Sequence, residues 1–228
     1  VPDVEAAVRL LGMLRDALAD RLVGFELMSA FSTALSRKHH PQLPDPLPGY
    51  PWYVLIQADD AATDAAMAER VEAALAQGVE AQIVLDATVA RSDAQAAALW
   101  ALRENISEAQ RVEGVSVKHD VSVPVSRIPQ LIDEGNRALE AAFPGIGIVA
   151  FGHLGDGNLH WNAFPPSGAR RDFAAWSAEV NRVAYDVVHR HGGSISAEHG
   201  IGVLKRDELP HYKPPLELEL MRAIKRTL

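Results

Sequence analysis

The chain contains 228 residues, of which 22 are basic and 30 are acidic, giving a formal net charge of -8 at pH 7. A chain with this excess of acidic residues repels a phosphate backbone, which argues against nucleic acid as a partner. Its 48% hydrophobic and 23% charged residues are typical of a soluble globular protein with one large or two small cores. No apolar run approaches the roughly 18 residues of a membrane span, so we expect none. Cysteine is absent, so any metal must be bound by His and carboxylate side chains.

The first residues, VPDVEAAVRL, do not resemble a secretory signal, because they lack a basic region followed by an apolar stretch. We therefore expect a cytoplasmic protein. A chain that begins with Val is also consistent with a piece of a longer polypeptide.

The N-terminal part of the chain has a helical pattern. Leucines recur at helical spacing between residues 4 and 34, which predicts one or two amphipathic helices. Five prolines between residues 41 and 51 exclude a helix there and indicate an extended connector. We therefore divide the chain into an N-terminal helical segment (1–40), a proline-rich connector (41–51) and a larger domain (52–228).

Helix and strand patterns alternate in the larger domain. Strands are predicted at 52–56, 79–87 and 115–123, with a hairpin at 146–164. Helices are predicted at 63–77, from Ser92 to about 110, from Ser126 to about 143, and from Phe173 to about 191. Valines alternate with polar residues between 115 and 123, which indicates a strand that is apolar on one side only. This pattern favours an α+β fold with an antiparallel or mixed sheet and helices packed on one face.

The segment FGHLGDGNLHWN, residues 151–162, is the most informative part of the sequence. Asp156-Gly157 is a strong signal for a two-residue hairpin turn. A turn at that point pairs His153 with His160 on one face, with Cβ atoms roughly 4.5–5.5 Å apart. Two imidazoles at this spacing can bind one metal ion. Asn162 shares their face, because side chains alternate along a strand.

A third ligand is available in the segment SISAEHGIG, residues 194–202, where flanking glycines expose Glu198 and His199. Two histidines and one carboxylate leave an open coordination position, which is typical of a catalytic metal site. We therefore predict a divalent metal, Zn or Mn, bound by His153, His160 and Glu198. His199, beside a ligand, is then the candidate general base.

Three further residues could bind an anionic substrate. Arg103 and Ser107 are four residues apart on a predicted helix, so that both can reach one carboxylate. Lys118, on the polar face of the next strand, adds a second cation. Two cations are more than one carboxylate requires, and this favours a substrate with two carboxylates.

Each of these residues taken singly is better explained as a packed or solvated side chain, and only their combination favours a functional site. Two other classes of function stay open. Two histidines and a glutamate also suit a metal-assisted hydrolase, although neither an H-E-x-x-H pattern nor a nucleophile elbow occurs. A non-catalytic interaction domain of the same fold is the third alternative.

The segments GHLGDGNLHWN, SAEHGIG and LWALRENIS, with VKHDVSVPVSRI, closely resemble the C-terminal half of FAD-linked oxidases of the vanillyl-alcohol oxidase type. This resemblance extends from about Tyr50 to Leu228. It implies a cap domain that binds a metal and a small 2-hydroxy acid, which is oxidised to the 2-oxo acid with hydride transfer to FAD. It also implies the residue roles given above: His153, His160 and Glu198 as metal ligands, His199 as the base, and Arg103, Ser107 and Lys118 as contacts to substrate carboxylates. We add Asn162, which shares the face of the two histidines, to the candidate substrate-binding residues.

The chain departs from the family at both ends. It contains no glycine-rich flavin-binding segment and stops before the tail that family members carry. We therefore expect FAD to be bound mainly by an N-terminal domain that is absent from this chain, and the chain to be inactive without that domain. The sequence does not identify the electron acceptor.

Overall fold

A computed structural model describes residues 1–59, 64–166 and 173–228. Its centre is a five-stranded sheet in the order β2-β1-β4-β5-β3. All neighbouring strands are antiparallel, which confirms the α+β class with an antiparallel sheet. The strands are β1 (Leu22–Ser29), β2 (Trp52–Ala58), β3 (Asp120–Ser122), β4 (Gly147–His153) and β5 (Asn158–Phe164).

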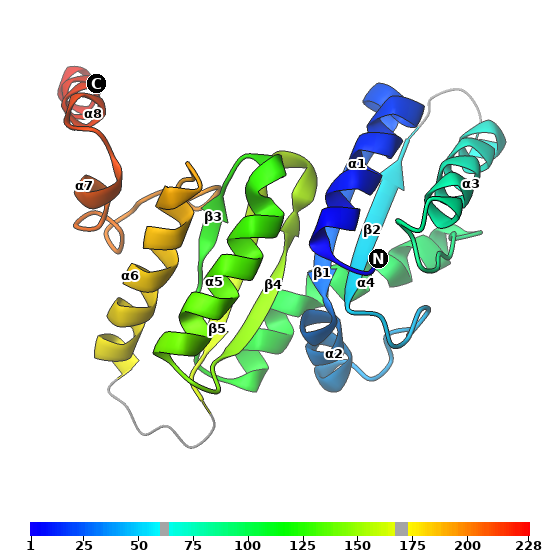
Figure 1. Ribbon diagram of the computed structural model, residues 1–228, viewed down its shortest axis with the longest axis horizontal. Coiled ribbons are helices and arrows are strands. Elements are labelled where there is room, and N and C mark those ends of the chain that lie inside the picture. The colour runs from blue at the N-terminus through cyan, green and yellow to red at the C-terminus, as the bar shows by residue number, and fades with distance from the viewer. Residues whose placement is uncertain (60–63, 167–172) are drawn as a thin grey trace.

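Helices cover most of one face of the sheet and part of the other (Figure 1). The α-helices in the described residues are α1 (Val4–Leu18), α2 (Ala30–His39), α3 (Asp64–Glu80), α4 (Asp93–Glu113), α5 (Ile128–Ala142), α6 (Phe173–Arg190), α7 (Leu209–Tyr212) and α8 (Pro215–Thr227). The expected layer of helices on one face is formed by α1, α3, α5 and α6. In addition, α2 and α4 lie against the opposite face.

The main hydrophobic core lies between the sheet and the layer of α1, α3, α5 and α6. There Leu27 and Trp161 of the sheet meet Leu14 of α1 and Leu131 of α5, and each of these side chains is buried. A smaller core on the opposite face consists of Met28, Leu35, Ile106, Ala109, Val149 and Phe151. Because this second core covers only part of its face, polar side chains of β3, β4 and β5 remain accessible beside it.

Two predicted elements are wrong. Residues 22–29 form β1 rather than a helix, because Phe25 and Leu27 pack on one face of the sheet while Met28 packs on the other. No strand forms at 79–87: α3 continues past Gly78 to Glu80, and Ile83 and Val84 bond to the Gly78 carbonyl as the helix ends.

Other boundaries differ less. The predicted strand at 115–123 is regular only in β3, although Val117 forms an isolated bridge with Ala163. Ser92 caps α4 as expected, accepting a hydrogen bond from the backbone N–H of Gln95 at 3.3 Å. α5 begins at Ile128 after a short 3-10 turn, without a side-chain cap from Ser126. The predicted helix start at Thr63 lies outside the described residues.

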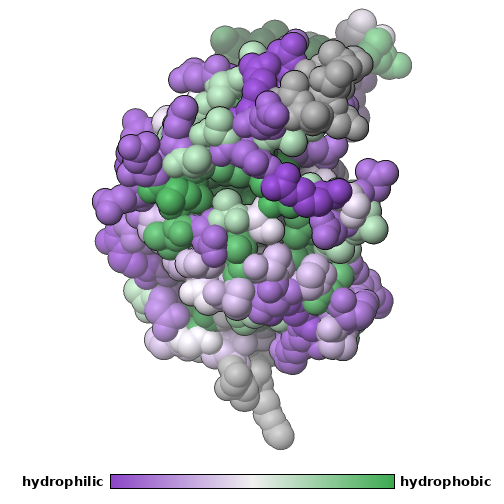
Figure 2. Space-filling model, turned by 90° about the vertical axis from the view of Figure 1, so that its right-hand side faces the viewer, coloured by the Kyte–Doolittle hydropathy of each residue, from purple (hydrophilic) through white to green (hydrophobic). Residues whose placement is uncertain are grey.

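A cavity of about 750 Å³ lies beside the edge strand β2 and is bounded by α3, the connector and residues 84–97. Figure 2 views this side of the molecule and shows hydrophobic side chains grouped between hydrophilic ones. None of the predicted site residues lines this cavity. Among the described residues, no helix combines the length and hydrophobicity needed to cross a bilayer.

Candidate metal and substrate site

The hairpin of β4 and β5 positions both histidines, but in a different register from the predicted one. His160 pairs with Phe151, and His153 pairs with Glu26 of β1. The turn is a 3-10 turn at Leu154–Asp156 followed by Gly157 at φ 76°, not a two-residue turn. A Cβ at Gly157 would lie 2.1 Å from the Val123 carbonyl oxygen, so this position requires glycine.

The prediction that His153 and His160 lie directly opposite each other is therefore wrong, but they share a face as expected. The register differs by two residues, and an even shift preserves which face each side chain occupies. The two rings are diagonal neighbours with centroids 6.5 Å apart. Leu154 and Leu159 are buried in the main core on the other side.

Both imidazoles approach the carboxylate of Glu198. Nε2 of His153 is 3.3 Å from Oε1 of Glu198, and Nε2 of His160 is 4.0 Å from Oε2. The side chains of His153 and Glu198 are each just under two-fifths exposed. The three predicted ligands therefore converge at an accessible point beside the sheet.

Glu26 is a site residue that the sequence analysis missed. It lies on β1 and is only 3% exposed. Its Oε1 is 2.5 Å from Nδ1 of His153, and its Oε2 accepts a hydrogen bond from Nε of Arg103 at 2.7 Å. The signal available in the sequence is a single acidic residue inside the apolar run GFELM.

Asp120, also missed, anchors the loop that carries Glu198 and His199. Its Oδ2 accepts the backbone N–H groups of three successive residues, Ala197 at 3.2 Å, Glu198 at 3.0 Å and His199 at 2.8 Å. Burial alone would raise the pKa of Asp120, but the N–H groups of His199 and Glu198 outweigh it and lower the pKa. Asp120 is therefore an ionised carboxylate at neutral pH. Its Oδ1 is buried without a hydrogen-bond partner.

His199, the predicted base, is more exposed than the three predicted metal ligands. Its side chain is 66% exposed, and Nδ1 is 3.6 Å from Oδ2 of Asp120. Its ring stacks on that of His160, with centroids 5.9 Å apart. Nε2 of His199 is then the atom available to accept a proton from a bound molecule.

Arg103 and Ser107 have different environments on α4. Arg103 is 8% exposed, and its guanidinium lies over the Phe151 ring, 4.7 Å from the centroid. The bond to Glu26 uses only Nε, so the two Nη groups are the donors that remain for a carboxylate. Ser107 is exposed one turn further along α4.

Lys118 and Asn162 both bond to Gln110 of α4. The Lys118 ammonium and the Asn162 amide donate to Oε1 of Gln110 at 2.8 and 2.9 Å. Desolvation lowers the pKa of Lys118 to about 8. Asn162 is 4% exposed, and its Oδ1 accepts the backbone N–H of His119 at 2.9 Å. Substrate contacts by Lys118, Asn162 and Ser107 stay predictions.

The distance between His153 and Glu198 suits two ligands of one divalent metal. Two ligand bonds of about 2.0–2.2 Å at a tetrahedral angle span about 3.3–3.6 Å, and the distance between His153 and Glu198 is 3.3 Å. Desolvation, followed by the nearby Arg103 cation, lowers the pKa of His160, which favours the neutral imidazole that binds metals. Among the described residues, the group of three whose ligand atoms all lie within 4.8 Å of one another is Asp120, Glu198 and His199, and the predicted set of His153, His160 and Glu198 does not meet this limit. In the Asp120 group, Oδ2 of Asp120 already accepts three backbone N–H groups, while its Oδ1 has no hydrogen-bond partner.

The chain matches the family described as FAD linked oxidases, C-terminal domain, over residues 1–228. It is 36% identical over 228 residues to D-2-hydroxyglutarate dehydrogenase of Stutzerimonas stutzeri (strain A1501), covering 98% of this chain and 47% of that protein. It is 41% identical over 182 residues to D-2-hydroxyglutarate dehydrogenase of Xanthomonas citri pv. viticola, covering 78% of this chain and 38% of that protein. The mitochondrial D-2-hydroxyglutarate dehydrogenase of Danio rerio is 35% identical over 216 residues, covering 94% of this chain and 39% of that protein. The chain thus spans less than half the length of these curated relatives.

Proposed function

Because the chain belongs to the FAD linked oxidases, C-terminal domain family, we propose that it is the metal- and substrate-binding part of an FAD-dependent D-2-hydroxy-acid dehydrogenase. The part of these relatives that the chain does not match would then contain the main FAD-binding domain. The observation that carries this proposal is the convergence of His153, His160 and Glu198 at one accessible point of the sheet.

His153, His160 and Glu198 would bind a divalent metal, Zn or Mn. Such a metal supplies Lewis-acid polarisation of the substrate 2-hydroxyl, and bound FAD supplies the hydride acceptor. His199 receives the hydroxyl proton at Nε2 while the substrate is oxidised to the 2-oxo acid. Asp120, beside Nδ1 of His199, stabilises the imidazolium that results.

The substrate carboxylate would be bound by the Nη groups of Arg103, which Glu26 orients through Nε. Lys118, Ser107 and Asn162 are the other candidate contacts. Lys118 provides a second cation beside Arg103, which favours a substrate with two carboxylates. The three relatives described above are named for such a substrate, D-2-hydroxyglutarate. We therefore propose that D-2-hydroxyglutarate is preferred over D-lactate.

The metal site is tested by titrating zinc and manganese into the purified chain and measuring binding calorimetrically. We expect one site in the wild type and an affinity at least about tenfold lower in His153→Ala, since a ligand is lost. His191→Ala is the matched control, because His191 bonds to Glu134 outside the site. Equal isotherms for the wild type and His153→Ala would contradict the ligand assignment.

The dehydrogenase activity is tested in the full-length protein that contains this chain. Anaerobic addition of D-2-hydroxyglutarate should bleach the flavin absorbance, and Arg103→Ala should lower kcat/KM for this substrate by about 10²-fold through loss of the carboxylate contact. An unchanged kcat/KM for every 2-hydroxy acid would exclude Arg103 from substrate binding.

A further inference from the structure

We propose that Glu26 is a positioning residue that keeps the ring proton of His153 on Nδ1, so that Nε2 is the free ligand atom, and that also orients Arg103. This inference rests on the proposed function, because it takes His153 as a metal ligand and Arg103 as a substrate contact. It states that one carboxylate orients both side chains. Glu26 itself touches neither metal nor substrate.

The contacts of Glu26 are made in a buried environment. Its side chain is 4% exposed, against 10% for Arg103 and 38% for His153. The three residues come from β1, α4 and β4, and only folding brings them together. A buried carboxylate that lacked these partners would be strongly disfavoured.

The identity of the donors fixes the position of the proton. Nε of Arg103 carries a hydrogen at every physiological pH, so it must donate to Glu26. Glu26 is thereby paired with a permanent cation, and a carboxylate paired in this way accepts hydrogen bonds, so Nδ1 of His153 is the donor in its contact with Oε1. A neutral imidazole has a single N–H, which leaves the lone pair on Nε2. That atom faces Oε1 of Glu198 at 3.3 Å.

A carboxylate bonded to the second ring nitrogen of a histidine is a common arrangement beside metal ions. Histidines that bind metals generally donate the other ring N–H to a carboxylate or carbonyl, which fixes ring orientation and makes the ligand nitrogen more basic. In this chain the same carboxylate holds Nε of Arg103, so the Nη groups of Arg103 keep a fixed direction relative to His153. One residue of β1 thus sets the relative geometry of the two predicted binding functions.

Glutamine cannot replace Glu26 in this arrangement. A side-chain amide offers one acceptor oxygen and one NH₂ donor, whereas both neighbours of Glu26 are donors. In Glu26→Gln either Arg103 or His153 therefore loses its acceptor. If the NH₂ group faces His153, the ring proton moves to Nε2, and that nitrogen no longer has a free lone pair.

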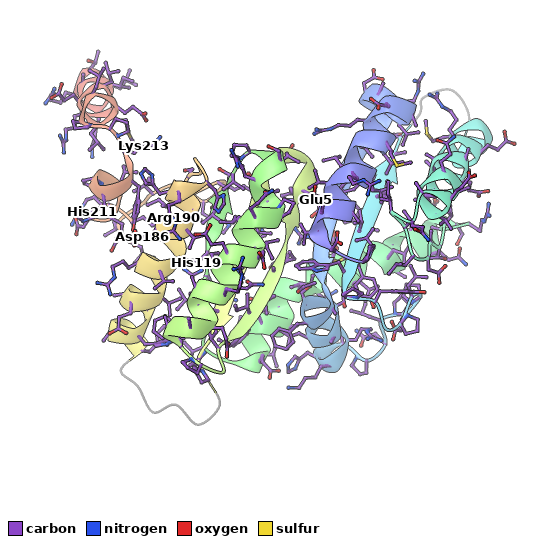
Figure 3. All side chains as sticks on the ribbon, in the orientation of Figure 1. Glu5, His119, Asp186, Arg190, His211 and Lys213 are labelled. Carbon is purple, nitrogen blue, oxygen red and sulfur yellow. The ribbon has the colours of Figure 1, made fainter. Side chains whose placement is uncertain are left out.

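The chain provides a matched control at Glu134. This carboxylate also joins an arginine and a histidine, with Arg190 Nε at 3.0 Å and His191 Nε2 at 2.8 Å. Arg190 is on α6 (Figure 3), in the helical layer that covers the other face of the sheet from the predicted ligands. Glu134→Gln therefore removes the same kind of interaction without affecting the site.

The first measurement is zinc affinity of the 228-residue chain, by competition with a chromophoric chelator. We expect Glu26→Gln to weaken binding by about 10–100-fold and Glu134→Gln to leave it within about twofold of the wild type, because its partners are not ligands. Circular dichroism establishes that each variant is folded. Unchanged affinity in folded Glu26→Gln would overturn the inference.

The second measurement uses the metal-free wild type, so it does not depend on a variant that folds. Nitrogen-15 chemical shifts of the His153 ring at about pH 9, where an ordinary imidazole is neutral, distinguish the two tautomers. Hydrogen on Nδ1 supports the inference, and hydrogen on Nε2 overturns it. A wild type that has the Nδ1–H tautomer but binds no zinc would instead overturn the metal site of the proposed function, leaving the orientation of His153 by Glu26 intact.

Discussion

Asp120 illustrates how one buried carboxylate can determine the shape of a loop. Three successive backbone N–H groups, those of Ala197, Glu198 and His199, point at its Oδ2. Loops with consecutive N–H groups aimed at one anion are rigid only while that anion is present. The directions of Glu198 and His199 therefore depend on a residue of β3 that need not contact any ligand.

We predict that Asp120→Ala lowers the free energy of unfolding by about 1–3 kcal/mol, because three partly buried backbone N–H groups lose their acceptor. Zinc affinity should fall as well, since Glu198 is no longer held in place. Urea unfolding and a zinc titration measure the two effects. Asp133→Ala, which removes only an exposed ion pair with Arg137 on α5, should change the free energy of unfolding by less than about 0.5 kcal/mol. Equal stability of the two variants would exclude this role for Asp120.

His119 makes stability depend on pH. It is fully buried, and its Nε2 lies 3.0 Å from Oδ1 of Asn181 on α6. Desolvation lowers the pKa of His119 to about 4, below the value near 6.5 of an unfolded histidine. The unfolded state therefore binds the extra proton first as the pH falls.

We predict that the free energy of unfolding is insensitive to His119 above about pH 6.5 and decreases from there towards about pH 4. The loss attributable to His119 reaches about 3 kcal/mol at most. Chemical denaturation at a series of pH values measures this slope. His119→Phe, which cannot titrate, should have a flatter profile in that interval, and an identical slope in both proteins would assign the effect to other groups.

At the level of elements, helices and hairpins with local signals were predictable. The cap of α4 by Ser92 and the shared face of His153 and His160 follow from short-range patterns, and the structure confirms them. β1 was not predictable by the same means. Leu22 continues the helical spacing of the preceding leucines, and Phe25, Leu27 and Met28 are buried on both faces of the sheet, so no alternation of polar and apolar residues appears.

The packing of α5 on β5 depends on the absence of a side chain at Gly135. A Cβ at this position would lie 2.2 Å from Cη2 of Trp161. Trp161 cannot move away easily, because it is fully buried and its Nε1 donates to Oδ1 of Asn136 at 2.9 Å. The contact between the helix and the sheet is therefore as close as the backbone permits.

We predict that Gly135→Ala lowers the free energy of unfolding by about 1–3 kcal/mol through overpacking. Gly12→Ala is the contrasting variant, because Gly12 lies in α1 and a Cβ added there would meet nothing within 4 Å. There the higher helix propensity of alanine should raise the free energy of unfolding by about 0.5–1 kcal/mol. Thermal unfolding of both variants tests the pair, and destabilisation by Gly12→Ala or a neutral Gly135→Ala would contradict it.

At the scale of the whole molecule, the sequence identified the candidate ligands but not their supporting residues. His153, His160, Glu198 and His199 occur in two short glycine-rich segments with recognisable spacing. Glu26 and Asp120 act through partners far away in the chain, and no local pattern reports a contact of that kind. The register error in the hairpin was even, so both histidines kept a common face, whereas an odd error would have placed them on opposite faces of the sheet.

The strand order has a consequence for how the chain acquires its structure. β1 pairs with β4 on one side and with β2 on the other, and the contact between Glu26 and His153 joins positions 127 residues apart. Closing so long a segment carries a large entropic cost before any contact compensates for it, so refolding should be slow, on the order of milliseconds to seconds. During synthesis on the ribosome, at roughly 5–20 residues per second, β1 and β2 are complete several seconds before β4, and the edge of β1 that later pairs with β4 stays unpaired for that time. That nascent edge is the point at which the growing chain is most open to aggregation or to chaperone binding.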